Sequence, residues 1–164
     1  MIKNRIINID NHEKMQSIIR KAISDGINVV ELDGTSIQSR DDYLEAIENG
    51  FDLPYEVRND RYLREHLYEL DLRYMGFVRY DGWVGIKGHM LVIHNYSEFI
   101  KGDTKLKQEI IKTFEDKVLP FWERGGELGI GDEESWEDSR EPAIERALEV
   151  AKTRAKPFNV YLVD

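Results

Sequence analysis

The chain has 164 residues, of which 41% are hydrophobic and 34% are charged, and its formal net charge is −9. This length and composition predict one folded domain spanning residues 1–164 rather than a disordered chain. No apolar run approaches the ~18 residues of a membrane span, and no signal peptide is expected. The acidic balance argues against direct nucleic-acid binding. With no cysteine the chain has no disulfides, which fits the reducing cytoplasm.

The first third of the chain predicts a strand, a helix and a second strand. Ile6–Ile9 is a short apolar run, and Asn11 or His12 begins a helix that Asp25-Gly26 ends. The apolar residues of this helix recur three and four positions apart: Met15, Ile18, Ile19, Ala22 and Ile23. Asn28–Leu32 then reads as a strand. Such a unit usually places its two strands side by side and parallel, with a right-handed crossover.

Ser39 predicts the start of the next helix, and Asp42 can complete a capping box with it. The apolar face of this helix is Tyr43, Leu44, Ile47 and Phe51, and Asn49-Gly50 ends it. A connector containing Pro54 follows. Another helix begins at Asn59 or Asp60, and its apolar positions are Leu63, His66, Leu67 and Leu70.

The second half returns to strands. Phe77–Ile86 predicts a hairpin around Asp81-Gly82, and Met90–Ile93 is apolar on both faces, as in a central strand. A helix from about Thr104 is expected to kink or end at Pro120. An acidic loop, a helix after Ser139 and a closing strand at Phe158–Val163 complete the pattern. The fold class is therefore α/β, with a small, mainly parallel sheet packed with helices.

The sequence contains little evidence of catalytic or cofactor-binding motifs. His89 and His94 are five positions apart on a predicted strand, so they point to opposite faces and do not chelate one metal. The glycines between Gly125 and Gly131 match neither a P-loop nor a dinucleotide fingerprint, and nearby carboxylates would repel phosphate. We expect no cofactor, no metal site and no enzymatic activity. A hydrolase using Glu65 and Glu69 would need that carboxylate pair to be buried.

The most informative feature is an acidic stretch between residues 41 and 71. Its carboxylates are Asp41, Asp42, Glu45, Glu48, Asp52, Glu56, Asp60, Glu65, Glu69 and Asp71. A solvated face with ion pairs inside the helices would explain this charge. However, Glu65 and Glu69 stack one helical turn apart, and Tyr55 and Tyr62 lie nearby in sequence. Rigid aromatics beside carboxylates suit an interface with a cationic protein surface.

Several segments, in this order, resemble the barstar family of ribonuclease inhibitors. They are Val30–Gly34, Leu53-Pro54-Tyr55, Leu63–Leu67, Leu91–Phe99, Phe114–Asp116, Phe121–Gly125 and Pro157–Leu162. The resemblance implies a barstar-like fold with additions: a strand–helix extension at 1–27, the hairpin, and an insertion at 126–155 before the last strand.

The resemblance also implies a function, namely an immunity-type inhibitor that blocks the active site of a basic nuclease with an acidic helix and loop. The implied contact residues are Tyr55, Glu56, Asn59, Asp60, Tyr62, Glu65 and Glu69. Tyr55 corresponds to a contact tyrosine of the family, and Glu65 corresponds to its key acid. Asn59 corresponds to the asparagine that starts the helix. If the alignment is shifted by one residue, Asp60 takes this position instead.

The family pattern is not matched throughout, and a second hypothesis stays open. Glu56-Val57 replace the usual aromatic-glycine pair of the loop, Arg64 stands where a tryptophan is common, and Arg61 stands at an acidic position. These arginines favour the alternative of a non-inhibitory protein-interaction module with a barstar-like fold.

Overall fold

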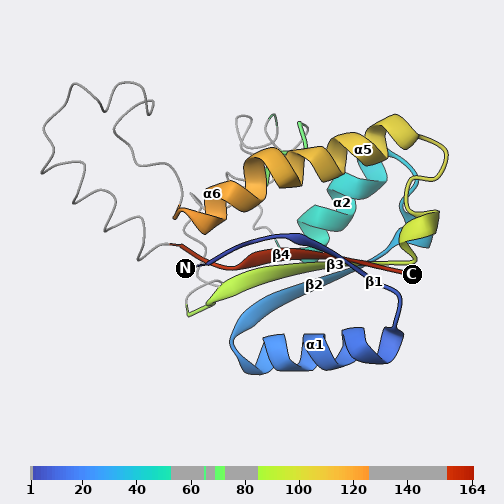
Figure 1. The fold of residues 1–164 in the computed structure, drawn as a ribbon. Coiled ribbons are helices and arrows are strands. Elements are labelled where there is room, and N and C mark those ends of the chain that lie inside the picture. Colours follow the sequence, from blue (N-terminus) through green and yellow to red (C-terminus); the bar gives the residue numbers. More distant parts are fainter. Residues whose placement is uncertain (1, 53–64, 66–68, 73–84, 126–154) are drawn as a thin grey trace, which may run out of the picture.

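The computed structural model describes residues 2–52, 65, 69–72, 85–125 and 155–164, which form an α/β fold. The sheet has four parallel strands in the order β1-β4-β3-β2. Their bounds are β1 (Ile6–Ile9), β2 (Ile27–Asp33), β3 (Gly88–His94) and β4 (Phe158–Val163). Helix α1 (His12–Ser24) covers one face, and helices α2 (Arg40–Gly50), α5 (Thr104–Thr113) and α6 (Leu119–Glu123) cover the other (Figure 1). The predicted α/β class and parallel sheet are confirmed.

The strand order differs from the expectation for the first unit. β1 and β2 are parallel, but they lie three positions apart, because β4 and β3 stand between them. β3 is buried along almost its whole length, as predicted for Met90–Ile93. In contrast, Asn8 of β1 and Glu31 of β2 are exposed. Strands that are apolar on both faces take the centre of a sheet, which leaves the half-polar strands at its edges.

Side-chain caps begin the first two helices as predicted. The Asn11 side chain accepts a hydrogen bond from the Lys14 backbone N–H (2.9 Å), so helix α1 begins at His12. The Ser39 hydroxyl accepts one from the Asp42 N–H (3.1 Å). The Asp42 carboxylate accepts the Gln38 N–H (2.9 Å), one residue before the position a standard capping box would use.

The two faces of the sheet carry separate apolar clusters. On the α1 face the buried residues are Ile9, Met15, Ile19, Ala22, Met90, Val92 and Val163. Ile23, predicted to belong to the buried stripe of α1, is 60% exposed, so that stripe is narrower than expected. The opposite face holds the larger cluster, in which Tyr43 and Ile47 of α2 pack with Leu91 and Ile93 of β3. Phe51, the residue that caps the end of α2, belongs to the same cluster.

The third long helix changes its winding near Pro120. Helix α5 ends at Thr113, a π-helical turn, η5, spans Phe114–Val118, and α6 continues to Glu123. Leu119 donates its N–H to the carbonyl of Phe114, five residues earlier. Proline has no N–H, and its ring clashes with the carbonyl four residues before it. The helix therefore neither kinks sharply nor ends at Pro120; it widens by one residue before the proline.

Other predicted elements fall wholly or mostly outside the described residues. These are the connector at Pro54, most of the helix from Asn59 or Asp60, the hairpin at 77–86, and the loop and helix between 127 and 154. The closing strand is confirmed at Phe158–Val163. Among the described helices, none has the length and apolar character that crossing a membrane requires.

Candidate functional site

Two of the seven implied contact residues, Glu65 and Glu69, are described by the structure. Tyr55, Glu56, Asn59, Asp60 and Tyr62 lie outside the described residues. Glu65 and Glu69 are both exposed. The Glu69 N–H donates to the Glu65 carbonyl (3.2 Å), which places the two glutamates one helical turn apart, as their spacing predicts. Their exposure also denies them the burial that a catalytic carboxylate pair needs.

The chain enters the protein interior directly after Glu69. Leu70, Asp71 and Leu72 are only 3%, 3% and 1% exposed. Leu70 has a φ of +67°, a left-handed conformation that is unusual for a residue with a branched side chain. Leu70 and Leu72 belong to the same core cluster as the buried residues of α2 and α5. These buried leucines fix the position of the exposed glutamate that precedes them.

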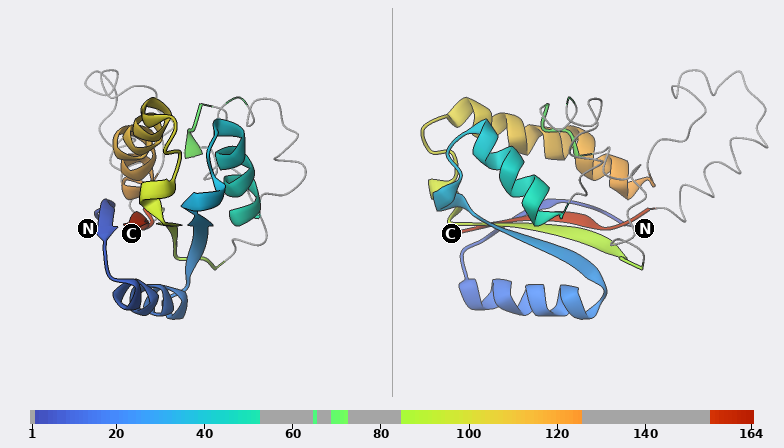
Figure 2. Two further views of the ribbon diagram at one scale, coloured as in Figure 1. Left: turned by 90° about the vertical axis from the view of Figure 1, so that its right-hand side faces the viewer. Right: turned by 180° about the vertical axis from the view of Figure 1, so that it is seen from behind.

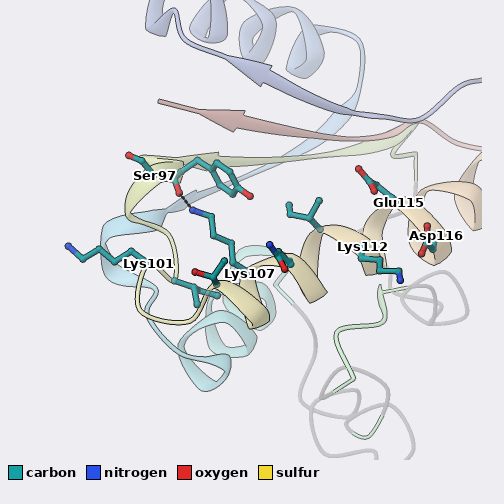
Figure 3. A pocket seen from close by; sticks show the side chains of 11 residues that line it. Ser97, Lys101, Lys107, Lys112, Glu115 and Asp116 are labelled. Atoms are coloured by element: carbon teal, nitrogen blue, oxygen red, sulfur yellow. Dashed lines mark hydrogen bonds between the residues drawn. The ribbon is translucent and has the colours of Figure 1, made fainter.

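A groove of about 550 Å³ lies beside Glu69, between this segment, the start of α2 and the α5–η5 helix. Its acidic side chains are Glu69, Glu109 and Asp116, and its basic side chains are Arg40, Lys112 and Lys117. Arg40 of α2 pairs with Glu109 of α5 at 3.2 Å. A second groove lies along α5–η5, and its charged residues are labelled in Figure 3.

Sequence reasoning did not select Glu109 or Asp116 as site residues. They are seven positions apart on one helical run, so their spacing predicts a shared face. Nothing local indicates that this face borders Glu69, which lies 40 residues or more earlier in the chain. Only the packing of both segments on the same side of the sheet brings these carboxylates together.

The acidic residues of α2 serve partly structural purposes. Asp41 and Asp42 lie in the first turn, where negative charge interacts favourably with the helix dipole, and Asp42 also caps. Glu45 and Asp52 are exposed, and Glu48 is half-buried. Arg40 is the only basic residue between positions 40 and 52, so this helix presents net negative charge to solvent. The first part of the acidic stretch found in the sequence is therefore an acidic surface along α2. Of the rest, Glu56 and Asp60 lie outside the described residues, and Asp71 is buried rather than on the surface.

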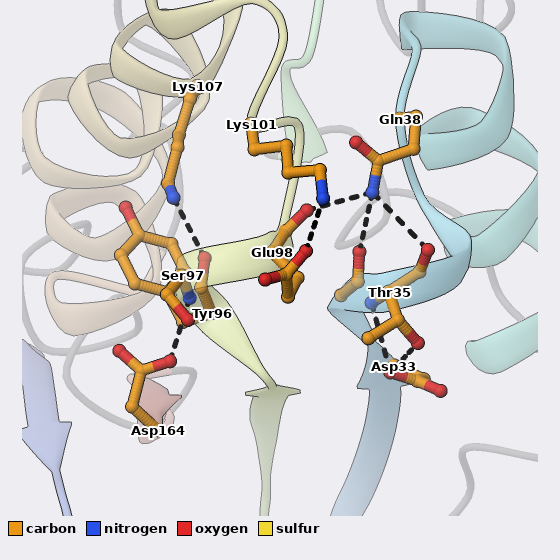
Figure 4. Close-up of polar contacts among 10 residues, drawn as sticks. Asp33, Thr35, Gln38, Tyr96, Ser97, Glu98, Lys101, Lys107 and Asp164 are labelled. Atoms are coloured by element: carbon orange, nitrogen blue, oxygen red, sulfur yellow. Dashed lines mark hydrogen bonds and ion pairs between the residues drawn. The ribbon is translucent and has the colours of Figure 1, made fainter.

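The carboxyl ends of β2, β3 and β4 form a network of internal hydrogen bonds (Figure 4). Asp33 accepts bonds from the Thr35 N–H (3.0 Å) and hydroxyl (2.7 Å) and from the Asn95 amide (3.1 Å). The Thr35 and Asn95 bonds lower the pKa of the Asp33 carboxyl. Asp164 accepts the Ser97 N–H at 2.7 Å. These polar groups form hydrogen bonds with one another. The contacts at this edge of the sheet are therefore structural, and the groups do not form an open ligand site.

The histidines of β3 point to opposite faces of the sheet, as predicted. His89 packs between the rings of Phe51 and Trp122, at centroid distances of 5.8 and 5.1 Å. On the α1 face, His94 Nε2 donates to Glu31 at 2.8 Å, and its ring lies 6.3 Å from that of His12. In the described part of the chain, no three His, Asp or Glu side chains form a group able to hold a metal ion.

Comparison of the chain with protein-family models, curated proteins and solved structures yields no match. The candidate site therefore has to be judged on its own geometry, together with the resemblance of the short segments described above. That geometry is an exposed pair of glutamates beside a charged groove and the acidic α2 surface. This surface is open and charged, and it is not an enclosed pocket.

Proposed function

We propose that this protein is a cytoplasmic, barstar-like inhibitor of a basic nuclease and acts without a cofactor. The observation that carries the proposal is the pair Glu65 and Glu69, exposed one helical turn apart, with Glu69 on the rim of a groove that also contains Glu109 and Asp116. Carboxylates at the centre of an interface suit the arginines and lysines of a cleft that binds nucleic-acid phosphates. The acidic α2 surface extends the same sign of charge.

The arrangement of the resembling segments supports this proposal. The three segments similar to the strands of the family are β2, β3 and β4, which are neighbours in the sheet in chain order. The segment that carries Glu65 and Glu69 joins the core on the same face as α2 and α5. The additional unit, β1 with α1, pairs at the far edge beside β4 and covers the opposite face. It therefore leaves the candidate face free to bind.

The energetics require several charge pairs. A carboxylate 4 Å from an arginine gains about 4 kcal/mol at an effective dielectric of 20, but desolvation cancels much of this gain. A face with one or two pairs would bind weakly, whereas Glu65, Glu69 and Asp116 together provide three carboxylates. Complementary charge also accelerates association at low salt, by a factor of about 10 to 1,000.

The basic residues of the groove favour the alternative function, a non-inhibitory interaction module. Arg40, Lys112 and Lys117 balance the three carboxylates of the groove, so its net charge is close to zero. Arg61 and Arg64 add positive charge to the sequence just before Glu65. A partner with a mixed surface, and not a strongly cationic nuclease, would suit such a groove.

The decisive experiment co-expresses the protein with the basic nuclease encoded nearest to its gene and measures cell survival and nuclease activity. We expect inhibition at a ratio of about 1:1 that weakens as salt is added. Removing one partner of an interfacial charge pair should weaken binding by at least about 30-fold. We expect this from Glu65→Ala and Glu69→Ala. Glu13→Ala is the control, because this exposed glutamate lies on α1 at the other face of the sheet.

Two results would contradict the inhibitor proposal. One is that the nuclease neither binds nor is inhibited at low salt. The other is that a Glu65→Ala, Glu69→Ala double variant inhibits as well as the unchanged protein. If affinity purification instead recovers a partner that is not a nuclease, and both glutamates are needed to recover it, the interaction-module alternative is supported.

A further inference from the structure

A second groove of about 680 Å³ runs along the α5–η5 helix (Figure 3). Most of the residues that line it do not line the groove beside Glu69. Its apolar side chains are Tyr96, Ile100 and Ile111. Lys112 and Asp116 border both this groove and the one beside Glu69, so the helix forms a ridge between the two. The groove has the volume of a ligand site, but it lies along an open helix face.

The two ends of this groove carry opposite charges. Lys101 and Lys107 lie at one end, where the Lys101 ammonium also pairs with Glu98 at 2.7 Å. Glu115 and Asp116 lie at the other end, with Lys112 near them (Figure 3). Lys107 is held in place: its ammonium donates to the Tyr96 carbonyl (2.8 Å) and sits 4.1 Å from the centre of the Tyr96 ring. An ammonium has three protons, so Lys107 keeps donors for a ligand.

The length of the groove suits a short extended peptide. From Thr104 to Asp116 the helix advances about 18 Å at ~1.5 Å per residue. An extended chain covers the same distance in about six residues at ~3.3 Å each. The Tyr96 ring is not open to an aromatic ligand, since Lys107 covers one side and the Phe99 ring stacks near it at a centroid distance of 6.0 Å. Flat heteroaromatic ligands such as nucleobases therefore fit poorly.

We propose that this groove binds an extended segment of a partner protein, about six residues long. The segment carries a carboxylate at the end facing Lys101 and Lys107, an apolar side chain over Ile111, and a basic residue at the end facing Glu115 and Asp116. This inference does not depend on the inhibitor proposal, because it concerns a different groove, although Asp116 borders both grooves. A partner bound here and a partner bound beside Glu69 would contact the same ridge.

The test selects peptides from a displayed library of random hexapeptides on the immobilised full chain at low salt. Affinities of the selected peptides are then measured by fluorescence anisotropy. We expect sequences with Asp or Glu at one end, Lys or Arg at the other and an apolar residue between them. Lys101→Glu and Glu115→Lys should each weaken binding by about fivefold. Both positions are exposed, so these changes leave the fold intact.

Matched variants separate a specific groove from general charge attraction. Lys105→Glu is the control, because Lys105 is exposed on the same helix but borders another groove, with Gln38 and Ser39. It should leave binding unchanged. The double variant with both reversed charges should prefer peptides whose two charged ends are exchanged. The proposal is overturned if no peptide is enriched, if the single reversals bind like the unchanged chain, or if Lys105→Glu weakens binding equally.

Discussion

The buried histidine of β3 makes the stability of this protein depend on pH. His89 is 2% exposed, and the rings of Phe51, Trp122 and Phe158 surround it at centroid distances of 5.8, 5.1 and 5.6 Å. Its Nδ1 accepts a hydrogen bond from the Asn28 amide at 3.2 Å, which suits a neutral imidazole. Burial, helped by the positive charge of Lys156, lowers the pKa of His89 to about 4.

The lowered pKa determines the sign and the size of the effect. In the unfolded chain a histidine titrates near pH 6.5, so the unfolded state takes up a proton first as the pH falls. The contribution of neutral His89 to stability is complete above pH 6.5 and is lost progressively down to pH 4. The full loss is about 3 kcal/mol, of which about 2 kcal/mol is already lost at pH 5.

The assay compares urea unfolding of the unchanged protein and of His89→Gln at pH 7.5 and pH 5. All other ionisable groups are the same in both proteins, so the difference between the two pH dependences isolates His89. We expect the unchanged protein to lose about 2 kcal/mol more than the variant between these pH values. Equal losses in the two proteins would refute the reasoning, whatever the stability of His89→Gln at neutral pH.

Three further substitutions test the packing. Asn4→Ala removes a buried amide that bonds the Leu119 and Lys156 carbonyls and the Phe158 N–H, so urea unfolding should show a loss of about 2 kcal/mol or more. Gly34→Ala places a methyl group 2.5 Å from the Asn95 carbonyl oxygen, so calorimetry should find that the free energy of unfolding falls by about 1–3 kcal/mol. Gly102→Ala is the control and should have no steric cost, because nothing lies within 4 Å of the added methyl group. Ser39→Ala should cost about 1 kcal/mol in the same unfolding assay, because α2 loses its cap. An unchanged stability in any of these three would contradict the contact on which it rests.

Local chemistry explains why some elements were predicted closely. Asn11 and Ser39 begin helices because their side chains accept backbone N–H groups within three residues, and such contacts depend on neighbouring residues alone. Gly26, with a φ of +82°, ends the first helical unit for an equally local reason. The central strand at Met90–Ile93 was evident because both of its faces are apolar.

Long-range packing explains the errors. The partner of β1 is β4, whose residues come about 150 positions later, so no local pattern could reveal that β1 and β2 are separated. The 60% exposure of Ile23 shows that the sheet covers a narrower stripe of α1 than the apolar spacing of the helix indicates. The chain accommodates Pro120 with a π-helical turn whose Phe114 and Val118 are buried in the core, and it does not end the helix there.

The same division applies to the candidate site. By itself, the sequence determined the α/β class, most of the described helix starts, the central and closing strands, and the helical spacing of Glu65 and Glu69. Each follows from contacts between residues close in the chain or from the periodicity of apolar side chains. The tertiary structure decided the strand order and the meeting of Glu69 with Asp116 in one groove. These depend on which buried surfaces fit together, and that choice is made across the whole chain rather than within any short segment of it.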